Sequence, residues 1–158
     1  MSNKTIALIG NQNCGKTTLF NVLTGANQYV GNWPGVTVDK VIGKVSSLDW
    51  DIVDLPGLYS LSPYSPEEVV SRNYLLKGDF DAVLNIVDAS HLERSLSLTL
   101  EVASFGLPMV VALNMIDVME ATGIKIDVEK LSKNLGIKVI DISASKNIGI
   151  DKVLEALK

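Results

Sequence analysis

The sequence has little of what several classes of protein need. Its single cysteine, Cys14, cannot form a disulfide within the chain, which is typical of a reducing compartment. The longest apolar run, residues 107–113, falls well short of the roughly 18 residues needed to cross a bilayer. The first residues lack the basic start, the long apolar stretch and the cleavage site of a signal peptide. These absences predict a cytosolic chain that does not insert into a membrane.

Basic residues are too few to form a stripe that would bind nucleic acid. The chain has 14 Lys and Arg against 18 Asp and Glu, for a formal net charge of -4. Nucleic acid is therefore not an expected partner, and any anionic ligand must be held by local groups. The single histidine, His91, has no second His or Cys at ligand spacing, which favours a surface residue at a helix start over a metal ligand.

Apolar residues make up 47% of the 158 positions, enough for one folded domain spanning 1–158. Strands are predicted over six apolar runs, 5–9, 37–45, 50–55, 82–87, 107–113 and 138–142. Helical patterns lie at 16–23, 67–76, 92–105, 127–135 and from 150 onward, and residues 27–36, 46–49 and 56–66 have the composition of loops and turns. This order predicts an α/β fold, a six-stranded mostly parallel sheet with one antiparallel strand and helices on both faces.

Residues 10–17, GNQNCGKT, match the pattern of a glycine, four residues, a glycine, a lysine and a serine or threonine, between a predicted strand and a predicted helix. In that setting backbone N–H groups and the helix dipole bind phosphates, Lys16 bridges the β- and γ-phosphates, and the Thr17 hydroxyl binds Mg²⁺. The motif predicts a P-loop within a Ras-like fold. The predicted phosphate-binding residues are Gly10, Asn11, Gln12, Asn13, Cys14, Gly15, Lys16, Thr17 and Thr18.

Two further segments are predicted to complete a magnesium site and to respond to the γ-phosphate. Mg²⁺ takes octahedral oxygen ligands and keeps waters, so Asp54 is predicted to hold it through a water and Thr37 through its hydroxyl. Gly57 would offer its N–H to the γ-phosphate. A loop that closes only on a γ-phosphate becomes a switch on hydrolysis. The residues predicted for these segments are Gly35, Val36, Thr37, Val38, Asp39, Asp54, Leu55, Pro56 and Gly57.

The end of the fifth predicted strand has the chemistry of a guanine site. A carboxylate such as that of Asp117 accepts two parallel hydrogen bonds from the ring N–H and the exocyclic amine of guanine, a pair that adenine lacks. Asn114 would brace the loops, Met115 would pack on the purine, and the segment after the last strand would offer a backbone N–H to the guanine carbonyl. The predicted base-site residues are Asn114, Met115, Ile116, Asp117, Ser143, Ala144 and Ser145.

One expected catalytic side chain is missing from the motifs. Leu58 follows Gly57, where GTPases that position a water with a side chain often carry Gln. Leucine cannot orient a water, so hydrolysis must depend on another group or be slow. GTP hydrolysis at a low rate is therefore the predicted activity.

Four segments carry a resemblance to a known family, 10–21 (GNQNCGKTTLFN), 31–40 (GNWPGVTVDK), 54–67 (DLPGLYSLSPYSPE) and 87–94 (VDASHLER). With residues 114–117 they resemble the N-terminal G domain of the ferrous-iron transporter B (FeoB) family. The resemblance implies a role in GTP-dependent Fe²⁺ uptake at the cytosolic face of the inner membrane. It also implies a helical regulatory domain and a transmembrane part outside this chain, no iron binding by this domain, and leaves a homo-oligomer open.

The resemblance suggests a replacement for the missing Gln. Relatives with Asn at the position of Asn13 use K⁺ as an activator, which implies that Asn13 and the backbone carbonyls of Gly31 and Trp33 hold K⁺ here. Gln12 stands where the family usually has Pro, which would loosen the P-loop. The residues predicted to take part in catalysis are Asn13, Lys16, Thr37 and Gly57.

Two other functions stay open. GTPases of tRNA modification or ribosome assembly share the Asn-bearing P-loop, but they usually carry Pro-Gly-Thr-Thr-Arg where this chain has Pro-Gly-Val-Thr-Val. The second alternative is a binding module that is gated by GTP and GDP and hardly hydrolyses, which Leu58 would permit.

Overall fold

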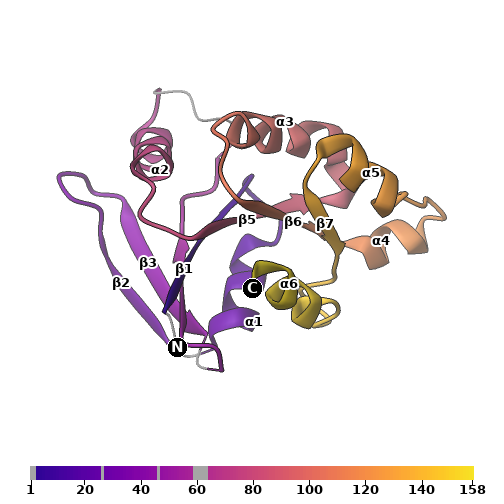
Figure 1. Cartoon of the computed structure of the whole chain (residues 1–158), viewed down its shortest axis with the longest axis horizontal. Helices are drawn as coiled ribbons and strands as arrows, with labels where there is room; N and C mark the ends of the chain where they lie inside the picture. Colours follow the sequence, from indigo (N-terminus) through magenta and orange to yellow (C-terminus); the bar gives the residue numbers. More distant parts are fainter. Residues whose placement is uncertain (1–2, 26, 46, 59–63) are drawn as a thin grey trace.

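The computed structural model describes residues 3–25, 27–45, 47–58 and 64–158, which form a central sheet with helices on both sides (Figure 1). The strands are β1 (Lys4–Gly10), β2 (Gln28–Asn32), β3 (Asp39–Val45), β4 (Trp50–Asp54), β5 (Ala82–Asp88), β6 (Met109–Asn114) and β7 (Lys138–Asp141). The helices are α1 (Lys16–Thr24), α2 (Pro66–Lys77), the short 3-10 helix η1 (Ala89–His91), α3 (Leu92–Ala103), α4 (Ile116–Ala121), α5 (Val128–Leu135) and α6 (Ile150–Leu157).

The seven described strands form one sheet in the order β2-β3-β4-β1-β5-β6-β7. Pairing is parallel from β4 through β1, β5 and β6 to β7, whereas β3 is antiparallel to both β2 and β4. The prediction of a mostly parallel sheet with one antiparallel strand is therefore confirmed.

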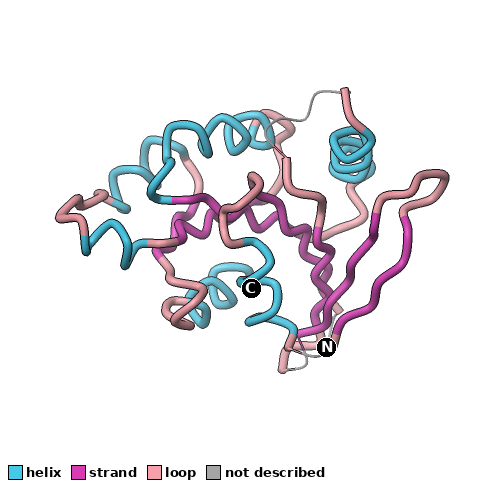
Figure 2. Tube along the Cα trace, turned by 180° about the vertical axis from the view of Figure 1, so that it is seen from behind, coloured by secondary structure: helices cyan, strands magenta, loops and turns pink. Residues whose placement is uncertain are grey.

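Alternate residues of the central strands face opposite helical layers. Ile6 and Leu8 pack with buried residues of α1 and α6, whereas Ala7 and Ile9 pack with those of α2 and α3. Toward β7, residues of α4 and α5 cover the sheet. The tube drawing shows the sheet between these helical layers (Figure 2). Both faces of β1 and β5 are buried, which explains why their sequences are apolar without alternation.

Local sequence signals fix the ends of α2. The Ser65 hydroxyl accepts a hydrogen bond from the Glu68 N–H at 3.1 Å, and Pro66 occupies the first turn, where its missing N–H costs nothing. Gly78 ends the helix in the left-handed conformation, with φ of 76°. These residues fix where α2 begins and ends, and the helix lies beside the hairpin formed by β2 and β3 (Figure 1).

The predicted strand count of six was too low by one. Residues 28–32, predicted as part of a loop, form the edge strand β2, which pairs with β3 from Gln28↔Gly43 to Asn32↔Asp39. An edge strand bonds to one neighbour only, and the side chains of Tyr29 and Val30 are 68% and 61% exposed, so no apolar alternation marks it in the sequence.

Other differences are smaller. Residues 116–121, which had no predicted element, form α4, and β3 begins at Asp39 rather than at 37. Parts of two predicted loops, residue 46 and residues 59–63, lie outside the described residues. No helix in the described parts has the length and apolarity of a membrane span.

Candidate functional site

A cavity of about 570 Å³ lies where the P-loop motif was predicted, at the carboxyl end of β1. β1 lies between β4 and β5, the point at which the strand order reverses, and α/β sheets bind ligands at such points. The lining residues are Asn11, Gln12, Asn13, Gly15, Lys16, Thr17, Thr18, Gly57 and Met115. Seven of them belong to the predicted phosphate loop, so the motif and the cavity coincide.

The P-loop backbone follows a path that few residue types permit. Asn13 has φ of 63° and Gly15 has φ of 92°, both in the left-handed region. A Cβ atom at Gly15 would overlap with the side-chain nitrogen of Asn114. The loop then leads directly into α1 at Lys16, so the N-terminus of that helix points at the cavity.

Two charged side chains meet beside the cavity. The Lys16 ammonium forms an ion pair with Oδ1 of Asp54, and both side chains are mostly buried, with 12% and 17% exposed. Burial raises the pKa of Asp54, and the charge and hydrogen bond of Lys16 oppose that rise. The carboxylate therefore lies at the end of β4 within reach of the P-loop, as predicted. Thr17 is exposed and lines the cavity.

Hydrogen bonds join the P-loop to the segment after β4. Asn11 donates from Nδ2 to the Leu58 carbonyl at 2.8 Å, and the Leu58 N–H donates to the Gly10 carbonyl at 3.1 Å. The side chain of Asn11 therefore braces two loops from a buried position. The Leu58 side chain is 2% exposed and packs in the core, so it contributes no group to the cavity.

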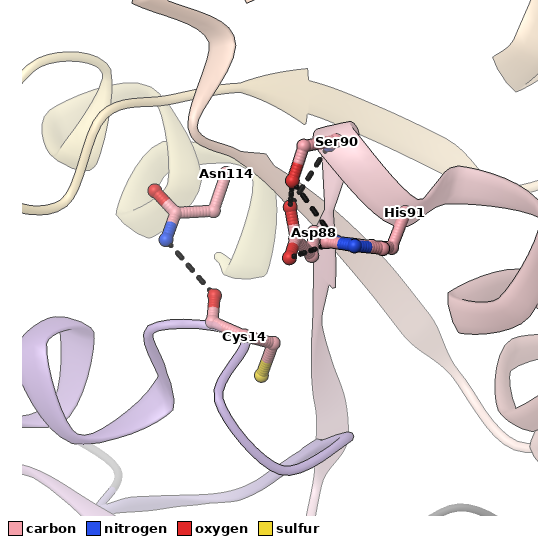
Figure 3. A network of polar contacts seen from close by, with 5 residues as sticks. All are labelled: Cys14, Asp88, Ser90, His91 and Asn114. Atoms are coloured by element: carbon pink, nitrogen blue, oxygen red, sulfur yellow. Dashed lines mark hydrogen bonds and ion pairs between the residues drawn. The ribbon is translucent and has the colours of Figure 1, made fainter. Parts of the chain in front are cut away.

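Asn114 connects the P-loop with the loop after β7. Its Nδ2 donates to the Cys14 carbonyl at 3.0 Å (Figure 3), and its Oδ1 accepts from the Ala144 N–H at 3.0 Å. The bracing role predicted for Asn114 is thus present in the geometry. Met115, with φ of 66°, turns the chain from β6 into α4 and lines the cavity.

Asp117 lies in the first turn of α4, next to the loop of residues 143–148. Its Oδ2 is 3.2 Å from the Lys146 ammonium. Partial desolvation pushes the pKa of Asp117 upward, but hydrogen bonds from Lys146 and Ser143 and the Lys146 charge outweigh it, so the pKa lies below its usual range. Asp117 is therefore an ionised acceptor two residues after Met115, although Asp117 itself does not line the cavity. Ser143 and Ala144 are buried, and Ser145 is exposed.

The structure does not bring the first predicted switch segment to the cavity. Thr37 is exposed in the turn that joins β2 to β3, where the Trp33 N–H donates to the Val38 carbonyl at 2.9 Å. Gly31 pairs with Lys40 within the hairpin. Trp33 packs away from the P-loop, in edge contact with Tyr74 of α2 at 5.3 Å between ring centroids. Neither of the two proposed carbonyl donors for K⁺ lines the cavity with Asn13.

Sequence reasoning assigned no role to Asp88, the last residue of β5. Its carboxylate is buried and accepts hydrogen bonds from the Ser90 N–H at 2.9 Å and from the Ser90 hydroxyl at 2.6 Å; His91 Nδ1 is 3.1 Å away (Figure 3). His91 is exposed where α3 begins, as predicted. Through its hydrogen bond with the Ser90 N–H, Asp88 caps η1.

In the described residues no group of three or more His, Cys, Asp or Glu could hold a metal.

Lys146 also had no predicted role, although it directly follows the predicted segment 143–145. Lys146 and Asp117 are 29 positions apart in the sequence, so no local sequence pattern predicts their ion pair. A basic residue after Ser143-Ala144-Ser145 was the only available signal.

The fold and these loops define a Ras-like P-loop domain of the GTPase class. A family model described as ferrous iron transport protein B matches residues 4–157, and the chain belongs to that family.

Solved structures agree with this assignment. An S. thermophilus NFeoB mutant bound to mGDP is 54% identical, with a TM-score of 0.96, over 99% of this chain and 60% of that one. The cytosolic domain of the T. maritima FeoB iron transporter, in a GDP form, is 42% identical, with a TM-score of 0.95, over 99% of this chain and 62% of that one.

Curated relatives are much longer than this chain. The Fe(2+) transporter FeoB of Shigella flexneri is 49% identical over all of this chain and 21% of its own length. That of Legionella pneumophila (strain Paris) is 51% identical over 95% of this chain and 21% of its own length. The chain thus spans about a fifth of the length of the relatives it matches.

Proposed function

We propose that this chain is the G domain of a ferrous iron transporter, a domain that binds GTP and GDP with Mg²⁺ and hydrolyses GTP slowly. The observation that carries the proposal is the pair of Asn114 hydrogen bonds, which ties the P-loop to the segment proposed to bind the base. Phosphate and base sites are thereby held at a fixed separation, as binding of one nucleotide requires. The GDP-bound relatives support the same ligand.

The residues at the cavity take complementary roles toward the nucleotide. Backbone N–H groups of residues 13–17 and the N-terminus of α1 would surround the β-phosphate. Lys16 would neutralise the β- and γ-phosphates, exchanging its Asp54 partner for phosphate oxygens. Gly57 would donate its N–H to the γ-phosphate. Asp117 would accept the two donors of guanine, and Ala144 or Ser145 would donate to the guanine carbonyl.

The donor set beside Lys16 fits Mg²⁺. Mg²⁺ prefers oxygen ligands and retains waters, and the Thr17 hydroxyl and the Asp54 carboxylate offer a direct and a water-mediated ligand. When bound, Mg²⁺ neutralises charge on the β- and γ-phosphates. Thr37 joins this set in the proposal only after the β2–β3 turn moves, because its present position is away from the cavity.

Hydrolysis without a glutamine needs another source of charge stabilisation. The Leu58 side chain lies in the core and cannot orient a water. We infer that Asn13, exposed at the cavity wall, holds K⁺ together with the carbonyls of Gly31 and Trp33 once the hairpin approaches. This arrangement requires the same hairpin movement as Thr37, so K⁺ activation and switch closure would occur together.

In the whole protein, the domain would act at the cytosolic face of the inner membrane and report its nucleotide state to helical and transmembrane parts outside this chain. The family membership supports this assignment, and the relatives are about five times as long. In this proposal iron passes through those other parts and is not bound by this domain.

The deciding experiment measures GTP turnover by residues 1–158 with Mg²⁺, in matched K⁺ and Na⁺ buffers, with ATP as the control. Faster GTP hydrolysis in K⁺, with ATP inert, is the expected result, and Asn13→Ala should remove the difference between the two buffers. Tight GTP binding with negligible turnover in both buffers would favour a nucleotide-gated binding module. RNA captured by the GTP-bound domain would favour a tRNA-modification or ribosome-assembly role.

A further inference from the structure

The carboxylate proposed to select guanine has a second neighbour, Lys146. The ammonium lies 3.2 Å from Oδ2 of Asp117, and 61% of the Lys146 side chain but only 24% of the Asp117 side chain is exposed. Lys146 therefore reaches the carboxylate from the solvent side. The Ser143 hydroxyl also hydrogen-bonds to this carboxylate, so Asp117 has two donors before a base binds, and of these two only Lys146 is cationic.

The backbone holds Lys146 in this position. Ser143 and Ile148 exchange two hydrogen bonds, each 3.0 Å long, and close the loop between them. Within it the Lys146 N–H donates to the Ser143 carbonyl at 3.3 Å, and the Asn147 N–H donates to the Ala144 carbonyl at 3.2 Å. The same loop is anchored to Asn114 through the Ala144 N–H. Lys146 thus lies in a hydrogen-bonded loop, residues 143–148, which is anchored to Asn114 at the proposed base site.

The chemistry of the purine determines what this partner does. Guanine presents a ring N–H and a 2-amino group, one donor for each carboxylate oxygen, whereas hypoxanthine keeps the ring N–H and lacks the amino group. In a site with the carboxylate alone, one oxygen would have no hydrogen-bond donor when hypoxanthine binds. The missing hydrogen bond lowers the affinity for hypoxanthine relative to guanine. With Lys146 present, that oxygen keeps a charged donor.

We propose that Lys146 weakens discrimination for the purine 2-amino group, so that this site takes inosine nucleotides as well as guanine nucleotides. The inference rests on the proposed function, because it assigns the base to Asp117. Adenine stays excluded, since its ring nitrogen at the same place is an acceptor and would face the carboxylate. Because the lysine is largely exposed, we expect its effect on affinity to be about three- to fivefold.

The test compares the affinities of GDP and IDP, with Mg²⁺, by competition against a fluorescent GDP analogue. The proteins are the wild-type chain, Lys146→Gln, Lys146→Arg and the control Lys133→Gln, which removes an exposed lysine from α5. The preference for GDP over IDP should rise about three- to fivefold in Lys146→Gln. It should stay at the wild-type value in Lys146→Arg and in Lys133→Gln.

The salt dependence of the preference for GDP over IDP distinguishes an electrostatic role of Lys146 from a merely structural one. Ions screen exposed charge pairs, so raising the salt concentration from 0.05 to about 0.5 M should bring the wild-type preference toward that of Lys146→Gln. Equal preferences in wild type and Lys146→Gln, with normal GDP binding, would overturn the inference alone. A wild-type chain that binds neither GDP nor IDP would overturn the proposed function and the inference together.

Discussion

Gly15 is the residue at which backbone angle and available space both exclude a side chain. Its φ of 92° is strained for any residue with a Cβ, and that Cβ would overlap with the Asn114 nitrogen that bonds to the Cys14 carbonyl. A substitution at this position therefore changes the P-loop and the base-site brace at once.

Gly15→Ala should cost about 1–3 kcal/mol of unfolding free energy and lower GDP affinity by more than about tenfold, because it displaces Asn114. Denaturant unfolding and GDP titration measure the two effects. Gly136→Ala is the matched control, since Gly136 also has positive φ, 68°, but nothing lies within 4 Å of its added Cβ. Equal losses of GDP affinity in both variants would contradict the role of the overlap with Asn114.

The thiol of Cys14 is buried within the same loop. A helix N-terminus normally lowers the pKa of a thiol, but burial raises the pKa of Cys14 to about 11, and the backbone hydrogen bond and charge of Lys16 only partly oppose this rise. Desolvation outweighs the helix dipole because the Cys14 side chain is 1% exposed. The thiol is thus a small apolar filler of the P-loop rather than a reactive group.

This pKa has a testable effect on stability. The unfolded thiol ionises near pH 9.0 and the folded thiol near pH 11, so the unfolded state releases its proton first and stability falls as pH rises through this window. The wild type should lose up to about 2–3 kcal/mol relative to Cys14→Ala between pH 8.5 and pH 11. Denaturant unfolding across this range measures the difference, and a constant difference would show that the folded thiol ionises normally.

At the scale of elements, the contact between α2 and the β2–β3 hairpin depends on a few aromatic rings. Trp33 lies edge-on to Tyr74, which stacks on Phe80 with centroids 5.6 Å apart, and the Lys40 ammonium lies 4.7 Å from the centre of the Trp33 ring. Among the described residues, the Trp33 indole nitrogen has no hydrogen-bond partner. The hairpin is therefore held by ring packing more than by polar bonds, which suits an element proposed to move.

Tyr74→Ala should release the hairpin from α2. We expect amide exchange in residues 28–42 to accelerate about tenfold or more, while exchange in β1 and β5 stays unchanged, because those strands are buried elsewhere in the sheet. Hydrogen exchange followed by mass spectrometry measures this. Leu76→Ala, at a 58% exposed position of the same helix, is the control and should leave the hairpin as it is.

Elements were predictable from the sequence where burial imposes a pattern. The central strands were found because apolar runs mark them, and helix α2 was found within 67–76 because its residues follow a helical pattern after Pro66. The edge strand β2 and the short α4 were missed: one exposes both faces, and the other spans only six residues directly after Asn114. Neither buries enough side chains to leave a periodic signal.

At the scale of the whole molecule, the site assembles from loops whose motifs are each contiguous in sequence. The P-loop, Asp54, Asn114 and the segment 143–145 were therefore predictable as parts, and the parallel sheet brings their strand ends to one edge. Contacts between distant loops, such as Lys146 with Asp117, were not predictable. The position of the hairpin is also set by tertiary contacts with α2, which a linear pattern does not encode.

Because one nucleotide would contact loops from both halves of the sheet, its binding should stabilise the whole domain as a unit. At about 100 times its Kd, a ligand that binds only the folded state contributes about 2.7 kcal/mol, which raises the midpoint of a domain of this size by roughly 5–10 °C. We expect GDP with Mg²⁺ to produce such a shift in a single thermal transition. ADP at equal concentration should produce none, and chelation of Mg²⁺ should reduce the GDP effect.

Differential scanning calorimetry of residues 1–158 makes this measurement. A single transition is expected if the domain, including β5 and the hairpin, unfolds as one cooperative unit. Two transitions, of which GDP moves only one, would show that the two halves of the sheet unfold separately and that the nucleotide contacts only one of them. Equal shifts with GDP and ADP would contradict selection by Asp117 while leaving the P-loop intact, because phosphates alone would then account for binding.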